Sequence, residues 1–396
     1  MKLRKMAILF TLSGCISLMI AGVFKGTKHS KEKHMYKEYH WRTEVKVPAG
    51  YPVSILGGSF YAEGLRKGKG MIEEIGTGGI GVTEEHETTF PHWYTGSGSP
   101  GFSSTSKAKL PPQNIMISWL SYVEGCEYEL KETDIDQKRI NTLFEEGFMY
   151  PGTLKSSPQR DGYDAIQVGL APGGVVILWV AGSGRSVEVG RYQAERKDVE
   201  FVPKDSLNGR SVLYSTVWRD NVLKRTKPKD DSVSILPVPY GVWDKYRVRY
   251  CWKAVLKTKD KHKYIRSILY EYYNGEEETL FGERTWRENQ IEKYHIPPHL
   301  QYDYLTGRAI PHEMVLSWYD ENDVRYHVAL VFDETEVFNA FAKAFSGQEN
   351  IAGELIVEVS KSKSDAASFW WQASEKFGLP TPKSKYMNPV IKNSKT

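Results

Sequence analysis

Two stretches of this chain decide the fold: Leu110-Pro-Pro-Gln-Asn-Ile-Met-Ile-Ser-Trp119 and Ala309-Ile-Pro-His-Glu-Met-Val-Leu-Ser-Trp318. The proline, the serine and the tryptophan recur at a constant offset of 199 positions. Each stretch reads as a strand and leads into a second strand-like run, at 127–130 in the first copy and 325–330 in the second. The chain therefore contains one supersecondary unit used twice, at a period too long for a solenoid.

An amphipathic helix is predicted after each pair of strands. In the first copy Thr133 and Asp136 form a capping-box-like start, and Gly147 suits the left-handed position that follows a last turn. The offset of 199 places the second helix start at Asp333, opposite Asp134.

A further strand is predicted after each helix. Val175–Val180 is apolar and β-branched throughout, which indicates a central strand covered on both faces, and Glu354–Val359 is its weaker counterpart. With many strands and few helices, the predicted class is α+β.

The predicted architecture consists of two tandem related domains, each a mostly antiparallel sheet with an amphipathic helix packed on it. The first domain is expected at 39–195, a linker at 196–231, and the second domain at 232–396.

The N-terminus is expected to attach the protein to a membrane. A basic start precedes the run Leu12-Ser13-Gly14-Cys15, which has the form of a lipoprotein signal with Cys15 as the acylated residue. The apolar run continues from Met6 to Phe24, roughly 28 Å of helix at about 1.5 Å per residue, so an uncleaved membrane anchor stays open. Residues 1–24 are thus an anchor and 25–38 a tether, and either reading places the rest across the inner membrane.

Composition narrows the class of protein. Hydrophobic content of 40% and aromatic content of 13% indicate a folded chain, and a net charge of +4 is too small to indicate a nucleic-acid partner. Besides Cys15, only Cys126 and Cys251 occur; we expect buried free thiols, and their pairing stays open. No Cys/His spacing of a structural zinc site is present.

No catalytic, cofactor-binding or metal-binding residues are predicted. Gly76-Thr-Gly-Gly-Ile-Gly81 fits the dinucleotide pattern, but an acidic, proline-ended segment follows where a helix is needed. No serine lies in a nucleophile elbow. Carboxylate pairs for glycoside hydrolysis have no sequence spacing, so that class stays open. The expectation is a protein that is not an enzyme.

The tryptophans point to binding. Trp119, Trp179 and Trp318 lie within predicted strands and are assigned to the core. Trp93 and Tyr94 precede a glycine-rich segment that reaches Phe102, and these three residues are the candidates for an exposed partner-binding loop.

Several motifs in the first half together resemble a known family. They are Tyr51-Pro-Val53, Leu110-Pro-Pro112 with Ile117-Ser-Trp119, Tyr163-Asp164, and Val168-Gly-Leu-Ala-Pro-Gly-Gly-Val-Val176 with Trp179. The chain resembles uncharacterised bacterial lipoproteins that are encoded beside type VI secretion phospholipase effectors. The match covers 41–192, with Gly169 to Gly174 its most specific part, and the second half lacks the Ala-Pro-Gly-Gly run.

The resemblance implies a periplasmic, membrane-anchored immunity protein that binds a phospholipase effector and blocks its active site. The alternatives are an envelope lipoprotein that binds glycan through its aromatic residues, or a hydrolase with unrecognised carboxylates.

Overall fold

The computed structural model describes most of the chain after residue 35. The described residues are 36–63, 69–81, 93–95, 107–150, 159–226, 236–258, 262–282, 298–322, 325–345, 352–359 and 368–373. They belong to one compact unit, Tyr36–Thr396.

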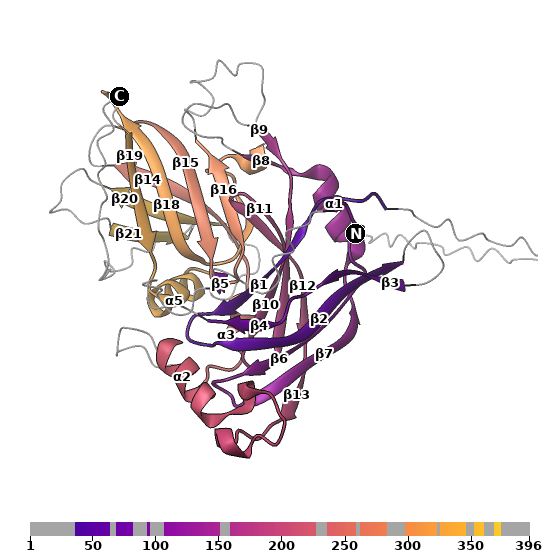
Figure 1. Ribbon diagram of the computed structural model, residues 1–396. Helices are drawn as coiled ribbons and strands as arrows, with labels where there is room; N and C mark the ends of the chain where they lie inside the picture. The colour runs from indigo at the N-terminus through magenta and orange to yellow at the C-terminus, as the bar shows by residue number, and fades with distance from the viewer. Residues whose placement is uncertain are drawn as a thin grey trace, which may run out of the picture. The chain divides into compact units, whose positions relative to one another are not determined.

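The first copy of the repeat forms two main sheets, a small two-stranded sheet and one helix (Figure 1). One sheet has the strand order β13-β7-β6-β2-β3 with β4 added on β2, and the other contains β5-β1-β10-β11-β12. The elements are β1 Arg42–Pro48, β2 Val53–Glu63, β3 Lys69–Glu74, β4 Gly78–Ile80, β5 Trp93–Thr95, β6 Asn114–Ser121, β7 Cys126–Asp134, α1 Gln137–Glu146, the two-stranded pair β8 Phe148–Tyr150 and β9 Gln159–Asp161, β10 Ala165–Ala171, β11 Val175–Gly182, β12 Arg185–Gln193 and β13 Glu195–Asp198.

A connecting segment and the second copy follow. The predicted linker contains short 3₁₀ turns and helix α2, and α3 leads into the second copy. The elements are η1 Lys204–Ser206, η2 Val212–Tyr214, α2 Thr216–Thr226, α3 Val242–Lys245, β14 Tyr250–Thr258, β15 His262–Tyr272, β16 Glu277–Phe281, η4 Pro298–Leu300, β17 Thr306–Arg308, β18 Pro311–Asp320, β19 Arg325–Val331, α5 Glu334–Ala344, β20 Gly353–Val359 and β21 Ser368–Ala373.

The two copies share one topology, which confirms the α+β class. The order β19-β18-β15-β16 repeats β7-β6-β2-β3, and β17-β14-β20-β21 repeats β5-β1-β10-β11. In both copies the first strand pairs in parallel with a strand that follows the helix along the chain, β1 with β10 and β14 with β20. This pairing corrects one assignment: residues 354–359 in β20 correspond to β10, so the counterpart of β11 is β21.

The register of the central strands repeats as well. Trp119 lies opposite Ile55, Trp318 lies opposite Ile265, and in both copies the register shifts immediately beyond that pair. A bulge at the same place gives both sheets the same local bend and twist.

The helix starts differ from the prediction in the first copy. Asp136, not Thr133, caps α1 by accepting a hydrogen bond from the Arg139 amide, because β7 continues to Asp134. Asp333 caps α5 as predicted. The equivalent caps are therefore 197 positions apart, two fewer than the offset of 199 between the repeated strands. The first copy has one extra residue in a bulge of β7 and a turn between β6 and β7 that is one residue longer than its counterpart.

Each copy contains a tryptophan–cation cluster between its two sheets. In the first copy the rings of Trp41 and Phe60 pack edge to face with centroids 5.7 Å apart, and Lys109 Nζ lies 4.3 Å from the Trp41 ring centroid. Lys109 is paired with Glu73, and both side chains are less than a tenth exposed. The indole of Trp41 donates a hydrogen bond to the carbonyl of Leu110 at 3.3 Å.

The second copy repeats this cluster residue by residue. The ring of Trp252 packs edge to face on Tyr270 at 5.4 Å, and its indole donates to the carbonyl of Ala309 at 3.3 Å. Arg308 lies over the Trp252 ring and donates from Nε to Glu278 at 2.8 Å. Duplication has thus preserved a buried charge pair as well as a strand order.

The two copies share one nine-stranded sheet. Strands β12 and β16 pair antiparallel, with Arg185 opposite Glu278, and Arg185 Nη1 lies 3.3 Å from the Glu278 carboxylate. Burial pushes the pKa of Glu278 upward, but Arg308 and Arg185 outweigh it, so the pKa of this carboxyl lies below its usual value. One carboxylate therefore joins the cluster of the second copy to a strand of the first.

Strand β11 lies between two hydrophobic cores, which confirms that it is covered on both faces. Alternate residues enter the core of the first copy and the core of the second. The first set is Val176, Leu178 and Val180, and the second is Val175, Ile177 and Trp179. The helix faces pack accordingly, α1 on the first core and α5 on the second.

The two later cysteines are free thiols. Cys126 is buried, as expected, and burial raises the pKa of its thiol. Cys251 is exposed, which corrects its assignment to the core.

We predict that Lys109→Met lowers the free energy of unfolding by about 3–5 kcal/mol, because Glu73 then stays buried without its cation. The double variant Lys109→Met with Glu73→Leu should recover most of that loss, since it buries no charge. Urea denaturation of the three proteins measures this, and equal losses in the single and double variants would contradict it.

Candidate functional site

The predicted site residues have different outcomes. Cys15, the anchor at 1–24 and Phe102 lie outside the described residues, as does the side chain of Tyr94. Trp93 is 5% exposed and belongs to the core, so its expected exposure is wrong. None of the helices found in the described residues has the length and apolar character needed to cross a bilayer.

Trp93 is buried because glycines make room for it. Its ring packs edge to face on Trp179, with centroids 5.0 Å apart. A Cβ on Gly169 would lie 2.4 Å from the Trp179 ring and 2.7 Å from the Trp93 ring, and Gly275 approaches both rings from the second copy. Only glycine fits at 169, which gives a physical reason for the most specific stretch of the family resemblance.

We expect Gly169→Ala to lower the free energy of unfolding by about 1–3 kcal/mol or more, because the added methyl overpacks two fixed indoles. Gly162→Ala is the matched control, since a Cβ there meets nothing within 4 Å. Thermal unfolding of both variants checks the difference. Equal stability of the two would show that the tryptophan pair does not require glycine at 169.

The other end of this stretch forms a turn fixed by Glu124. Gly173 and Gly174 have φ angles of 78° and 75°, which glycine adopts readily. The Glu124 carboxylate accepts hydrogen bonds from the Gly173 amide at 2.9 Å, from the Tyr128 hydroxyl at 2.7 Å and from Ser121 at 2.9 Å. The turn at 172–174 is therefore held beside the turn at 122–125.

The connecting segment packs on these two turns. Arg219 in α2 donates to the Tyr122 carbonyl at 2.8 Å, and Trp218 donates from its indole to the Tyr122 hydroxyl at 3.0 Å. Farther along, the Tyr240 ring would lie 3.2 Å from a Cβ on Gly173. Burial and the Glu124 carboxylate raise the pKa of Tyr240.

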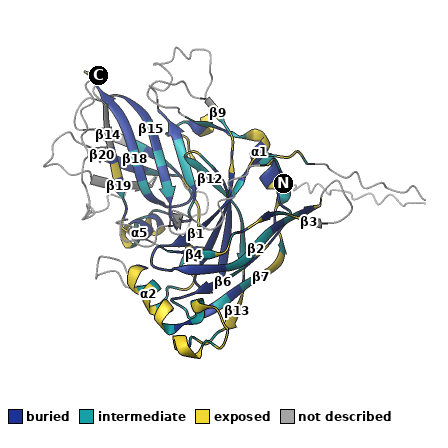
Figure 2. Ribbon diagram, in the orientation of Figure 1, coloured by how far each residue is buried: buried dark blue, intermediate teal, exposed yellow. Residues whose placement is uncertain are grey.

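Large apolar side chains are exposed along this segment. Of the ten such side chains on the described residues, six lie between 212 and 248, which concentrates exposed apolar area there. They are Val212, Val217, Trp218, Leu236, Tyr240 and Val248. Figure 2 shows α2 mostly in the colours of exposed and intermediate residues. We call Val217, Trp218, Tyr240 and the turns at 122–125 and 172–174 the connector surface.

The connector surface suits recognition of a protein better than chemistry. Its aromatic side chains are large and partly held in place, because Trp218 donates a hydrogen bond and Tyr240 rests on the Gly173 turn. Exposed Trp and Tyr with little freedom to lose are the residue types that dominate binding energy at protein interfaces.

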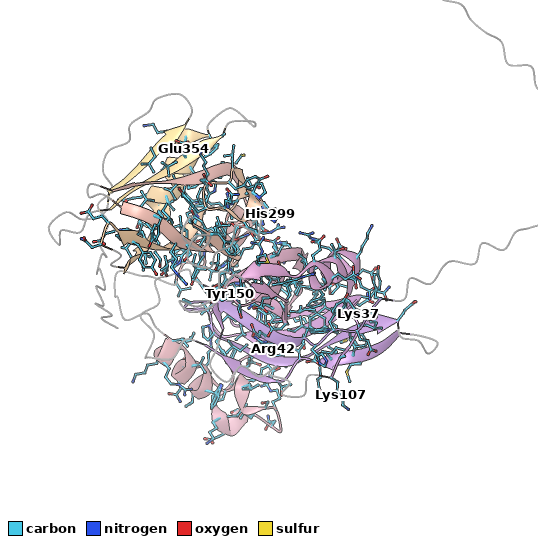
Figure 3. All side chains as sticks on the ribbon, turned by 90° about the horizontal axis from the view of Figure 1, so that it is seen from above. Lys37, Arg42, Lys107, Tyr150, His299 and Glu354 are labelled. Atoms are coloured by element: carbon cyan, nitrogen blue, oxygen red, sulfur yellow. The ribbon has the colours of Figure 1, made fainter. Side chains whose placement is uncertain are left out.

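A cavity of about 350 Å³ lies where β12 meets β16. Its lining includes His299, labelled in Figure 3, together with carboxylates paired to arginines. Arg247 binds Glu188 at 2.7 Å, and Arg249 binds Glu276. Burial raises the pKa of Glu188 despite Arg247. The Arg247–Glu188 pair joins the copies, as does the hydrogen bond that the Glu188 amide donates to Glu276 at 2.9 Å, so we interpret the cavity as part of the structural joint.

Two further groups bear on cofactors and metals. Gly78–Ile80, within the stretch that fits the dinucleotide pattern, forms strand β4 against β2, so this part of the stretch extends a sheet. Among the described residues, Glu271, His312 and Glu313 are the one group of metal-ligand type whose donor atoms lie together.

Sequence reasoning missed Trp218 and Tyr240. Both lie in or beside the predicted linker, where charges and prolines hide any periodicity. The signal that could have found them is the presence of Trp and Tyr in a segment otherwise composed as a linker.

The fold and the surface define an α+β protein made of two copies of a two-sheet unit, with exposed aromatic and apolar side chains on the segment between them. Residues 26–241 match a family described as protein of unknown function DUF2931, and the chain belongs to this family. The matched region ends just after Tyr240, so it includes the connector surface. No curated protein and no solved structure matches the chain.

We predict that Arg219→Met loosens α2 without unfolding the protein. The variant loses the bond to the Tyr122 carbonyl and the contact of the guanidinium with the Phe201 ring, whose centroid lies 4.9 Å away. A local loss of about 1.4 kcal/mol corresponds to about tenfold faster amide exchange in 216–226. Arg225→Met is the control, because Arg225 Nε bonds within its own helix. Unchanged exchange in Arg219→Met would contradict this anchoring.

Proposed function

We propose that this protein is an immunity protein, held at the periplasmic side of a bacterial membrane, that binds a type VI secretion phospholipase effector through the connector surface and covers its active site. The observation that carries the proposal is the position of the Gly169–Gly174 stretch. It carries the resemblance to immunity lipoproteins, and its turn lies directly beneath Tyr240.

The connector surface supports binding of a protein partner rather than catalysis. Tyr240 and Val217 are more than half exposed, and Trp218, next to Val217 in sequence, is 37% exposed. Arg219 and Glu124 fix the backbone below these side chains. A preformed surface loses little conformational entropy on binding, so apolar contacts there translate more fully into affinity.

The mechanism is stoichiometric occlusion. A stable complex of standard size buries about 800 Å² on each partner, enough to cover the entrance of a lipase active site. Acylation at Cys15, or a membrane span over residues 6–24, would concentrate the inhibitor beside the lipid that the effector attacks. The tether at 25–38 would let the folded unit reach the enzyme.

Co-expression with a periplasm-directed phospholipase tests the proposal. The enzyme to use is one encoded beside this gene. We expect the parent chain to restore growth and the double variant Val217→Asp with Tyr240→Ser to lose at least tenfold in binding, because a charge enters the apolar contact. Both side chains are more than half exposed, so the variant should keep its melting temperature.

The matched control is Leu305→Asp with Tyr304→Ser. These side chains are 39% and 37% exposed but lie in the second copy, beyond the family match. Rescue by the control and not by the connector variant supports the proposal. Absence of rescue by the parent chain, or binding of the purified protein to peptidoglycan with none to the phospholipase, would overturn it.

A further inference from the structure

Three glutamates face one another across neighbouring strands of the second copy. Glu277 on β16 lies opposite Glu271 on β15, and Glu271 lies opposite Glu313 on β18. Like charges directly opposite each other in a sheet destabilise it. Repulsion between these facing carboxylates therefore destabilises the sheet, and hydrophobic packing alone does not require glutamates at these positions.

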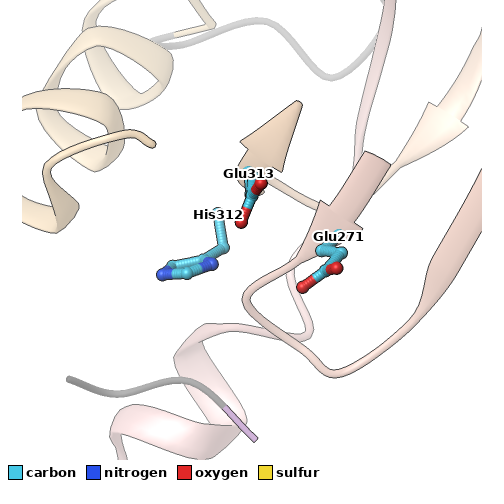
Figure 4. Close-up of side chains that lie close together, drawn as sticks. All are labelled: Glu271, His312 and Glu313. Carbon is cyan, nitrogen blue, oxygen red and sulfur yellow. The ribbon is translucent and has the colours of Figure 1, made fainter. Parts of the chain in front are cut away.

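A buried histidine joins two of these carboxylates. Tyr272 lies opposite Pro311 and Glu271 lies opposite Glu313, so His312 is the extra residue of a β-bulge. A bulge re-aims side chains, which allows the consecutive residues His312 and Glu313 to serve one site. Donor atoms of Glu271, His312 and Glu313 all lie within 4.8 Å of one another, and Figure 4 shows the three side chains. The His312 side chain belongs to a residue only 5% exposed.

Among the described residues, Lys46 on β1 is a cation on which Glu277, Glu44 and Glu271 act. A divalent ion bound by Glu271 and Glu313 would neutralise the charge of these two carboxylates when they are ionised.

We propose that Glu271, His312 and Glu313 form a binding site for a divalent transition-metal ion, of which Zn²⁺ is the representative. Imidazole and carboxylate oxygen are ligands that Zn²⁺ accepts at about 2.0–2.2 Å, and ligands around one tetrahedral ion lie about 3.4 Å apart. Donor atoms that lie up to 4.8 Å apart would have to approach one another by up to about 1.4 Å to reach that spacing. The ion would tie β15 to β18 and offset the repulsion between their glutamates.

The first copy provides the internal comparison. By register, Tyr61 and Asn114 occupy the places of Glu271 and Glu313, and Gln113 that of His312. Neither the amides nor the phenol is a good Zn²⁺ ligand. The site is therefore a property of the second copy, which lies beyond the family match, and it is independent of the proposed inhibition.

The experiment is a Zn²⁺ titration of the full-length chain after chelator treatment, read by competition with a chromophoric chelator. The test variant is His312→Gln with Glu313→Asn, which installs the residues that the fold already accepts in the first copy. We expect one site in the parent chain and at least a hundredfold weaker binding in the variant. Glu63→Gln, which removes an exposed carboxylate of the first copy, is the control and should bind as the parent does.

Cobalt spectroscopy separates loss of ligands from loss of fold. Co²⁺ should give ligand-field absorption in the parent chain that is absent from the variant, while circular dichroism of the two proteins stays the same. Equal Zn²⁺ affinity of parent and variant, or adventitious binding only, would overturn the proposal. If the variant unfolds, the single variant Glu271→Gln takes its place, with the same loss expected and the same overturning result.

Discussion

The structure depends on a buried cation held between a tryptophan and a carboxylate, and each of the two copies contains one such cluster. Lys109 with Glu73 and Trp41 fixes the two sheets of the first copy, and Arg308 with Glu278 and Trp252 does so in the second. A buried pair of this kind contributes little net stability, but removing one partner is costly, so the arrangement favours one packing over others. Both copies have this cluster and the same strand order.

The joint between the copies follows from the same cluster. Glu278 forms ion pairs with Arg308 in its own copy and with Arg185 of the other copy. Strand β11 contributes alternate residues to the two cores. The first copy consequently cannot lose its central strand without exposing the second core. Charge and packing thus make Tyr36–Thr396 one compact unit, although the repeat predicts two related domains.

Local patterns predicted much of this fold. The apolar run at 175–180 marked the central strand, and the repeated proline, serine and tryptophan marked equivalent strands. Two predictions were wrong because they depend on how strands pair. A bulge places the cap of α1 at Asp136, and the parallel pairing of β20 with β14 makes β20 the counterpart of β10. Trp93 looked exposed because the glycines that admit its ring lie 76 and 182 positions away. Ligands from two strands, such as Glu271 and Glu313, likewise leave no spacing to read.

We propose that the turn at 172–174 and the connecting segment together form the binding surface. Hydrogen exchange of the full chain, alone and with a type VI secretion phospholipase effector, tests this most directly. We predict slower exchange in the complex at 122–125, 172–174 and 212–223, with 298–345 unchanged. Protection confined to the second copy, or no protection at saturating enzyme, would contradict it.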